Sequence, residues 1–521
     1  MISHFATPYF KPHKRFATVL STMATLAVLL TGCGTSAPTA IPGMASTRTP
    51  VPRSSNPAPN ETATPKPTGA ANTSDATRSP TAVPVRQVNL DACIDVKPDL
   101  SATAPAARKS PGQIVYLDSA GNVALTDGSG RRTTQVTTDA FLAEDQGKAR
   151  AYQFPTFSND GKLLAFVSLD LTDNGRNMTQ TLHVAEARAR SKPVDLYSSN
   201  VDNIPYLDWS PNSESVAFLT IHSGQGEIRV SPRGGGKIAV FDTGTSAYWH
   251  WRSDSNAIVA HLSGAHRSAG SEAHISVIDA TASDSQAGTN QIESPPGQFQ
   301  SPHYSPNGKF MIFALANGDV DELVLADPTG TPVCSITAVN TGAYFAWSPN
   351  GQQLAVLDTI SPLQMPAKLT IFNLATGDQT VIDQQVVSFY WSPDGSKIAV
   401  YSVVTDAPAT KLGLGAARQY SPAQQSDNLS LRIAMFDADT GKAITVADTL
   451  PSRQFAQFFQ FFDQYSRAVT PWSPDGNNLV FVSFNREKQA SEIGVAALAQ
   501  SGDSVSLKRI ASGTLAFWSP N

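Results

Sequence analysis

The sequence predicts an all-β domain built from one repeated structural unit. An aromatic residue that starts a polar turn recurs eight times between Phe157 and Trp518, and six of the seven tryptophans occupy this position. Most copies precede a strand-like segment of alternating apolar residues, such as 397–401. Self-similarity at a regular spacing is the mark of repeat architectures, so the repeat decides the fold class before single elements are assigned.

The repeated turn has a physical rationale. The fullest copies read Trp-Ser-Pro-Asp-Gly, as in 391–395 and 472–476. Proline presets φ at the first turn position, Asp or Asn favours the second, and Gly accepts a positive φ. The aromatic residue ends one strand and fills the space against a neighbouring sheet. The eight copies begin at Phe157, Trp209, Trp251, Tyr304, Trp347, Trp391, Trp472 and Trp518.

The spacing gives the size and number of the units. Successive aromatic positions are 52, 42, 53, 43, 44, 81 and 46 residues apart, and four antiparallel strands in roughly 45 residues make one blade of a β-propeller. Segment 114–138 reads as three strands with no such turn before them, whereas 515–521 supplies an inner strand and turn. We therefore expect a single eight-bladed β-propeller over 113–521, with four-stranded antiparallel blades and closure by pairing of the N- and C-terminal strands.

The Trp-Ser-Pro-Asp-Gly run, followed by a strand like Ile-Ala-Val, resembles the repeat of TolB-like and WD-repeat-like propellers. The resemblance covers about 113–521 and implies the fold. It implies little about function, because such propellers serve as scaffolds, substrate-entry domains and enzymes. The α/β domain that accompanies the propeller in TolB has no counterpart in this sequence, so the partners of TolB are not carried over.

The N-terminal part predicts export and a lipid anchor. Cations precede an apolar stretch from Phe16 to Leu30, which is about 15 residues long, whereas a membrane-spanning helix needs about 20. This layout predicts a signal peptide over 1–32. The Leu-Thr-Gly-Cys sequence at 30–33 resembles the bacterial lipobox and predicts lipidation of Cys33; the alternative is a plain secretory signal.

The segment after Cys33 predicts a tether. Residues 33–88 are rich in Thr, Pro and Ser with almost no large apolar side chain, a composition that stays solvated and extended. Residues 89–112 then form an N-terminal extension before the propeller. The expected location is the extracytoplasmic side of the cell membrane. If Cys33 carries lipid, Cys93 and Cys334 remain as a pair in an oxidising compartment. We predict a disulfide between them; the alternative is two unpaired cysteines.

Charge and motifs exclude several function classes. The net charge is −5 and no Lys/Arg cluster lies outside the signal, so nucleic acid is not an expected partner. No nucleophile elbow, zinc-protease, phosphate-loop or calcium-loop motif occurs. No cofactor and a monomer are expected, and the chain reads as a binding protein more than an enzyme.

Long connections predict the functional face. Segments 138–151, 263–274, 288–298, 405–427 and 451–467 join second to third strands or one blade to the next, so all open on one face. Binding residues concentrate on such variable loops. Within 451–467 the spacing of Phe455, Phe458, Phe459 and Phe462 is that of one helix face. We predict either a binding patch for a protein or cell-envelope glycan, or a short helix that caps the propeller and buries the stripe.

Three polar residues predict a metal site. Asp208, His250 and His303 each precede the repeat aromatic residue in successive blades, so their side chains should converge near the central channel. They could ligate a divalent ion or serve as ordinary polar lining. The first function hypothesis is a membrane-tethered binding or scaffold protein that uses the loop face; the second is a carbohydrate-active enzyme of the metal-assisted lyase type.

Overall fold

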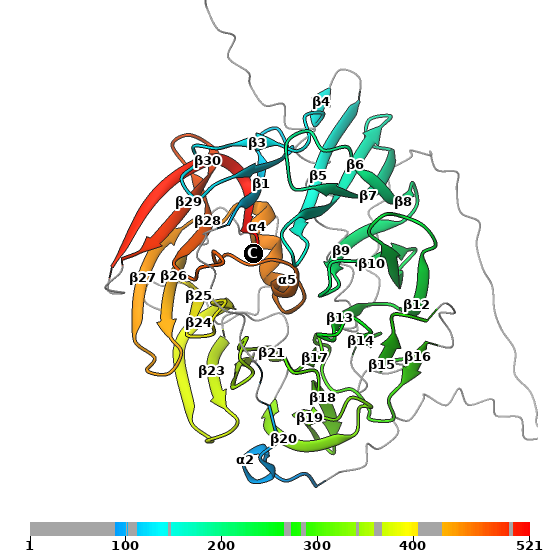
Figure 1. Cartoon of the computed structure of the whole chain (residues 1–521), viewed down its shortest axis with the longest axis vertical. Coiled ribbons are helices and arrows are strands. Elements are labelled where there is room, and N and C mark those ends of the chain that lie inside the picture. Colours follow the sequence, from blue (N-terminus) through cyan, green and yellow to red (C-terminus); the bar gives the residue numbers. More distant parts are fainter. Residues whose placement is uncertain are drawn as a thin grey trace, which may run out of the picture.

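The computed structural model shows an all-β chain whose sheets surround a pair of short helices (Figure 1). It describes residues 89–100, 102, 112–143, 147–264, 272–282, 288–339, 343–358, 367–404, 430–499 and 504–520. The predicted signal peptide, Cys33 and the tether lie outside the described residues. Among the described residues, no helix is long and apolar enough to span a membrane.

The first half of the chain contributes sheets in sequence order. One sheet contains β4 (Phe141–Ala143), β5 (Lys148–Phe157), β6 (Leu163–Thr172), β7 (Asn177–Glu186) and β8 (Val194–Ser199). The next contains β9 (Asn203–Trp209), β10 (Ser215–His222), β11 (Gln225–Pro232) and β12 (Ala239–Gly244). A third contains β13 (Ala247–Trp251), β14 (Ala257–Leu262), β15 (His274–Asp279) and β16 (Thr289–Gln291). All pairs in these sheets are antiparallel.

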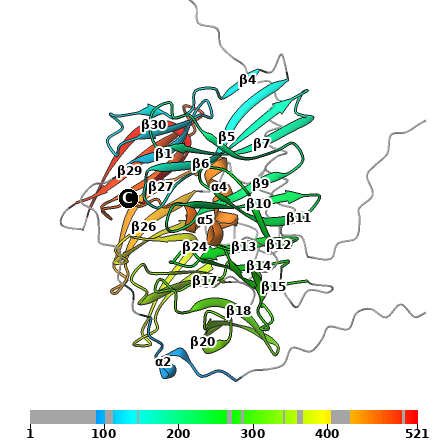
Figure 2. The same ribbon diagram turned by 45° about the vertical axis from the view of Figure 1, so that its right-hand side comes forward.

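The second half continues around the same centre (Figure 2). A four-stranded sheet contains β17 (His303–Tyr304), β18 (Met311–Asn317), β19 (Val320–Ala326) and β20 (Pro332–Val339). A seven-stranded sheet contains β21 (Ala343–Trp347), β22 (Gln353–Asp358), β23 (Ala367–Asn373), β24 (Gln379–Trp391), β25 (Lys397–Val403), β26 (Leu431–Asp437) and β27 (Ala443–Thr449). This sheet departs from the four-stranded prediction because β24 runs from one repeat into the next without Gly or Pro to end it.

The two ends of the folded part share one sheet. It contains β1 (Ile114–Asp118), β2 (Val123–Thr126), β3 (Thr134–Gln135), β28 (Asn478–Asn485), β29 (Ala490–Leu498) and β30 (Val505–Trp518). The first half of β30 pairs with β29 and the second half with β1, in the register Ile114 to Trp518. A Cβ at Gly513, between the halves, would lie 2.4 Å from the Leu117 carbonyl oxygen, so only glycine allows this approach.

The repeated turn is held by its serine, a role that the sequence analysis did not assign. In six copies the serine Oγ donates to the Asp or Asn Oδ1 two residues later, over 2.5 to 2.7 Å. The backbone N–H five residues on donates to the same Oγ. The predicted positive φ is present at Gly395. Ser213 and Ser255 adopt it where glycine is missing.

The aromatic position joins neighbouring sheets, as predicted. The indole of Trp209 on β9 donates to the Thr156 carbonyl on β5 over 3.4 Å, and that of Trp472 donates to the Tyr390 carbonyl on β24 over 2.9 Å. Apolar side chains fill the space between sheets, for example Val167 of β6 beside Trp209 of β9. The core is therefore divided among the spaces between successive sheets.

The N-terminal extension is fastened to the outside of the β17–β20 sheet. The predicted disulfide is present between Cys93, at the start of α2 (Cys93–Val96), and Cys334 on β20, with Cα atoms 5.0 Å apart. The backbone N–H of Ser335 also donates to the Asp91 carbonyl over 2.9 Å. Further along the extension, Asp99 forms an ion pair with Lys309, which lies between β17 and β18. The extension thus enters the fold far from β1.

Candidate functional site

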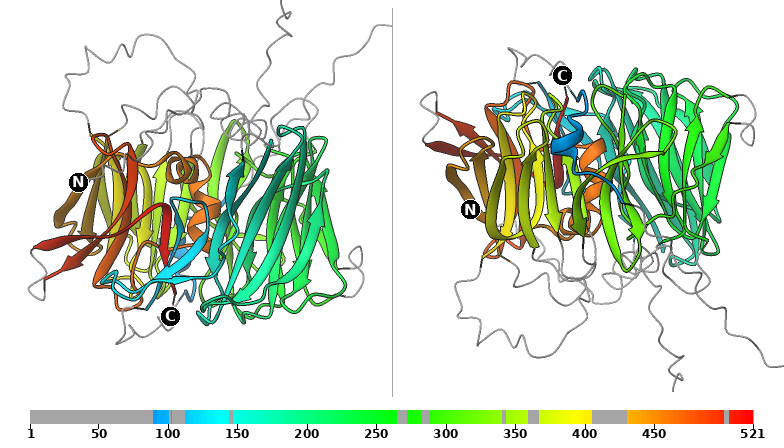
Figure 3. Two further views of the ribbon diagram at one scale, coloured as in Figure 1. Left: turned by 90° about the horizontal axis from the view of Figure 1, so that it is seen from above. Right: turned by 90° about the horizontal axis from the view of Figure 1, so that it is seen from below.

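Two helices occupy the middle of the ring of sheets (Figure 3). They are α4 (Arg453–Gln460) and α5 (Phe462–Ala468), which we call the central plug. Ser452 caps α4, because its Oγ accepts a hydrogen bond from the Phe455 N–H over 3.0 Å. The same hydroxyl donates to the Thr514 carbonyl on β30 over 2.5 Å. The cap therefore fixes the start of the plug to the sheet that contains both chain ends.

The plug buries the predicted aromatic stripe, so the binding-patch interpretation of these residues is wrong. Phe455, Phe458 and Phe462 are 3%, 3% and 1% exposed, while the side chain of Phe459 lies outside the described residues. The ring centroid of Phe462 lies 4.9 Å from that of Phe389, and that of Phe458 lies 5.3 Å from that of Phe517. The structure shows the alternative interpretation, a short helix that buries the aromatic stripe. The helix lies in the middle of the sheets, however, whereas the prediction placed it as a cap.

Polar contacts attach α5 to the inner strands. The Gln464 amide accepts from the Trp249 N–H over 2.8 Å and donates to the Trp249 carbonyl over 3.2 Å. Asp463 Oδ2 accepts from the Ser301 N–H over 2.8 Å, and the Tyr465 hydroxyl donates to the Pro205 carbonyl over 2.5 Å. These contacts reach β9, β13 and the segment before β17, so the plug joins several sheets.

An aromatic-lined cavity of about 50 Å³ lies between the plug and β9 and β13. Its walls include five aromatic side chains: Tyr206, Tyr248, Phe299, Phe461 and Tyr465. The wall residues of β9 and β13 belong to the first part of each strand, whereas the repeated turns follow the strand ends. The cavity therefore lies toward the variable connections, and we call it the mouth cavity.

Several polar groups around the mouth cavity are already engaged within the protein. The Gln464 amide is held by Trp249, and the Tyr206 hydroxyl donates to the Gln464 carbonyl over 3.1 Å. The volume is about a third of the ~150 Å³ that admits benzene. The cavity thus offers ring faces to a small apolar group, and its described wall residues include no Asp, Glu, His, Lys or Arg.

The three predicted metal ligands do not form a metal centre. His250 and His303 do come together, with ring centroids 4.5 Å apart, but His250 Nδ1 accepts from the Tyr304 N–H over 3.0 Å. Over the described ranges, no group of three or more His, Cys, Asp or Glu side chains is placed to hold a metal ion. The cation of Arg467 on α5 acts on Asp208 instead, so the alternative interpretation, polar channel lining, fits better.

Burial controls the titration of this lining. It raises the pKa of Asp208 to about 7, against the opposing effect of the Arg467 guanidinium, and it lowers the pKa of Arg467 to about 9. It also raises the pKa of Asp463 to about 7. The pKa of His250 falls well below its ordinary value through burial. Asp463 Oδ1 has no hydrogen-bond partner within the described part of the chain, which adds to the cost of its charge.

These shifts predict a pH dependence of stability. An acid whose pKa is higher in the folded state binds more protons when folded, so the contribution of Asp208 and Asp463 to stability falls as pH rises from about 4 to about 7. The lowered pKa of the buried His250 has the opposite effect on stability. We expect Asp463→Asn to remove part of this fall, since asparagine can still accept from the Ser301 N–H. Urea unfolding between these pH values measures it, with Asp319→Asn, a substitution at an exposed turn position, as control. Parallel curves for wild type and Asp463→Asn would contradict the assignment.

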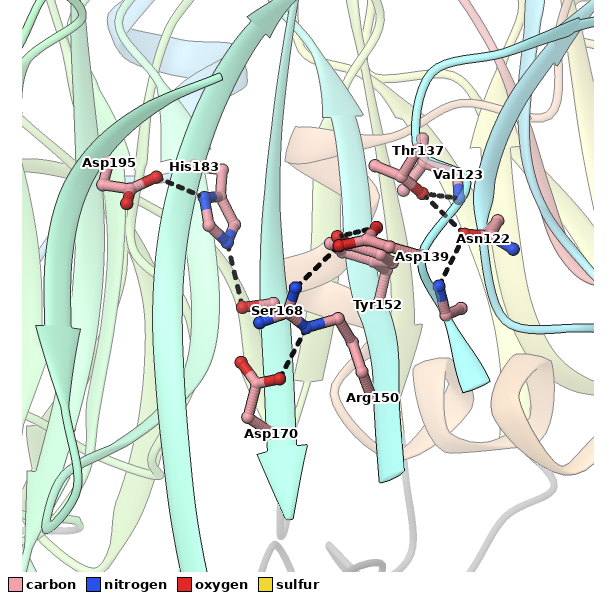
Figure 4. A network of polar contacts seen from close by, with 11 residues as sticks. Asn122, Val123, Thr137, Asp139, Arg150, Tyr152, Ser168, Asp170, His183 and Asp195 are labelled. Carbon is pink, nitrogen blue, oxygen red and sulfur yellow. Dashed lines mark hydrogen bonds and ion pairs between the residues drawn. The ribbon is translucent and has the colours of Figure 1, made fainter. Parts of the chain in front are cut away.

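A second polar cluster lies on the β4–β8 sheet (Figure 4). Arg150 forms ion pairs with Asp139 and Asp170, and the Tyr152 hydroxyl donates to Asp139 over 2.7 Å. Beside this network, His183 contacts Asp195 through Nδ1 over 2.7 Å and the Ser168 hydroxyl through Nε2 over 2.9 Å. Sequence motifs gave no signal for this cluster, because its members come from separate strands.

The Ser168, His183 and Asp195 contacts resemble a nucleophilic triad only in their order. Ser168 is 2% exposed and stands opposite Tyr152 in the sheet register, so a substrate carbonyl has no approach to it. The side chain of Asp195, which would be the sheltered member of a triad, is 65% exposed. We interpret the contacts as ties across β6, β7 and β8.

Comparisons with known proteins give weak likenesses. No protein family and no curated protein matches the sequence. Similar solved structures include dihydro-heme d1 dehydrogenase NirN (13% identity, 85% of this chain, 83% of that chain, TM-score 0.47). They also include an oligogalacturonate lyase with manganese (14%, 75%, 99%, 0.43) and TolB from Acinetobacter baumannii (16%, 54%, 66%, 0.33). We draw no functional conclusion from similarities at this level.

Proposed function

We propose that this chain is an exported, lipid-anchored binding protein. In this proposal Cys33 carries the lipid and residues 34–88 form the tether. The folded part binds a protein or a cell-envelope polymer through the face with the variable connections. The predicted localisation supports a role at the cell surface, and so does the length of the segment that follows Cys33 and could act as a tether.

We further propose that the ring has eight blades and is closed by its terminal strands. The pairing of β1 with β30 supports closure, because it joins the first and last strands of the folded part. Dividing the seven-stranded sheet at β24 gives two four-stranded groups that share β24, and dividing the terminal sheet at β30 gives one group of three strands and one of four that share β30. A closed ring leaves neither the first nor the last strand of the folded part as an unpaired sheet edge. Such a ring is also a rigid scaffold from which binding loops can extend.

The observation that carries the binding role is the mouth cavity. Ligand sites are typically concave and lined by aromatic side chains, and aromatic rings contribute much contact area at low entropic cost. The plug fixes Phe461 and Tyr465 against Tyr206 and Tyr248. A preorganised aromatic pocket on the variable face favours recognition of a partner's small apolar side chain or substituent. The lyase hypothesis loses its metal ligand set and is not proposed.

Pull-down from intact membranes after crosslinking tests the proposed function. We expect a discrete partner with wild type and its loss with Phe461→Ser, which changes the mouth cavity at a partly exposed position. The control Asn477→Ser alters an exposed residue at a repeated turn, on the opposite face. Retention of the same partner by Phe461→Ser would contradict the role of the cavity.

Fractionation tests the anchor separately. We expect wild type in the membrane fraction and Cys33→Ser either released or unprocessed. Normal processing together with membrane retention of Cys33→Ser would contradict lipidation at this residue.

A further inference from the structure

Six cationic side chains from three distant segments gather on the terminal sheet. Arg131 and Arg132 lie in the β2–β3 turn, Arg486 and Lys488 in the β28–β29 turn, and Lys508 and Arg509 on β30; all six are exposed. The sequence shows no contiguous Lys/Arg run here, and only the fold brings the segments together. We call these six residues the basic rim.

Hydrogen bonds and ion pairs place these segments beside one strand. Lys508 Nζ donates to the Ser129 carbonyl in the β2–β3 turn over 2.8 Å. Arg509 and Lys488 both form ion pairs with Glu492 of β29, over 3.2 and 3.0 Å. Since Lys508 and Arg509 are consecutive in a strand, their side chains leave opposite faces of the sheet. The cations therefore surround the free edge of β30.

The basic rim retains a positive charge after its local acids are counted. Asp127, Glu487 and Glu492 are the carboxylates on these described segments, and Asp503 lies two residues before β30 in the sequence, so six cations against four anions leave a net charge of +2. The whole chain has the opposite sign, −5. The rim is thus a positive patch on a negatively charged protein, and it would orient this edge toward an anionic surface.

An apolar side chain lies among the cations. Leu507, next to Lys508, is 54% exposed. Figure 3 shows β29 and β30 reaching past the neighbouring sheets at the side of the ring. A projecting edge with an exposed leucine between long cations matches the interfacial region of a bilayer, where apolar groups enter and cations meet headgroups. A soluble polyanion would make no use of the leucine.

We propose that the basic rim is a second membrane contact, which binds anionic lipid headgroups and orients the ring at the bilayer surface. Such attraction is weak for a free protein and is screened beyond about 8 to 10 Å at physiological salt. A tether converts it into an intramolecular step with an effective concentration in the millimolar range. The contact sets which face of the ring is directed away from the membrane, and it does not depend on the partner proposed above.

Vesicle binding tests the contact without the lipid anchor. The protein is full-length Cys33→Ser, and the probes are vesicles of phosphatidylcholine alone or mixed equally with phosphatidylglycerol. We expect salt-sensitive binding to the mixed vesicles only. Replacing Arg131, Arg132, Lys508 and Arg509 by Gln should lower partitioning at least tenfold, since each cation contributes roughly fivefold. Leu507→Ser should also lower it.

A matched variant controls for net charge. Replacing Lys162, Arg176, Arg188 and Lys192 by Gln removes four exposed cations from the connections of the β4–β8 sheet and should leave binding unchanged. Equal binding by the rim variant and the control variant would overturn the proposal. So would equal binding to both kinds of vesicle, or binding to soluble polyphosphate without binding to vesicles. Unchanged melting temperatures of all variants would show that the fold is intact.

Discussion

A chain that ends at Thr514 is expected to lose its cooperative fold. The deletion removes Leu515 to Trp518, the part of β30 that pairs with β1, and all four side chains are 1 or 2% exposed. Loss of one buried Trp side chain alone costs about 3–5 kcal/mol, and the truncation also exposes the edge of β1. Circular dichroism and thermal unfolding measure the effect. Removal of residues 1–88 is the control and should leave the melting temperature unchanged.

A point substitution tests the same closure more gently. Gly513→Ala places a methyl group 2.4 Å from the Leu117 carbonyl oxygen, so the β1–β30 junction must shift. We expect a lower melting temperature than for Gly234→Ala, where no atom lies within 4 Å of the new Cβ. Equal melting temperatures for the two variants, or an unchanged fold after truncation, would contradict closure through β30.

Removing the disulfide is expected to lower the free energy of unfolding by about 5 kcal/mol in the chain-entropy model. Cys93 and Cys334 are 241 residues apart, so the bridge restricts the unfolded chain strongly. Urea unfolding of Cys93→Ala/Cys334→Ala against wild type measures the loss. Reductant should destabilise wild type but leave the double variant unchanged. Equal stability of wild type and double variant would show that the bridge adds nothing.

The repeated turn predicted the sheets well because its residues act locally. Trp391 and its successors determine a strand end, a turn and a strand start within a few residues, and the predicted positive φ is present at Gly395. The disulfide could be predicted for a different reason, since the predicted lipidation of Cys33 leaves only Cys93 and Cys334 to pair. The continuation of β24 from one repeat into the next was not predicted, because a strand that continues past its sheet needs no special residue.

The roles of the site residues were harder to predict from the sequence, because they depend on contacts with segments that are distant along the chain. The spacing of Phe455, Phe458 and Phe462 reports a buried helix face, but it cannot say that the helix lies inside the ring. Asp208 and His250 were correctly expected near the centre, yet their titration depends on burial and on Arg467, which comes from a distant part of the chain. The basic rim could not be predicted from the sequence for the same reason, because its three segments are far apart along the chain.

Site-specific photo-crosslinking tests the central claim, that the mouth cavity on the variable face is the binding surface. A photoreactive phenylalanine analogue would replace Phe461 in one chain and Asn477, exposed at a repeated turn, in another. We predict one discrete crosslinked species in intact membranes from position 461 and none from position 477. Crosslinking from position 477 alone, or the same species from both positions, would contradict the account.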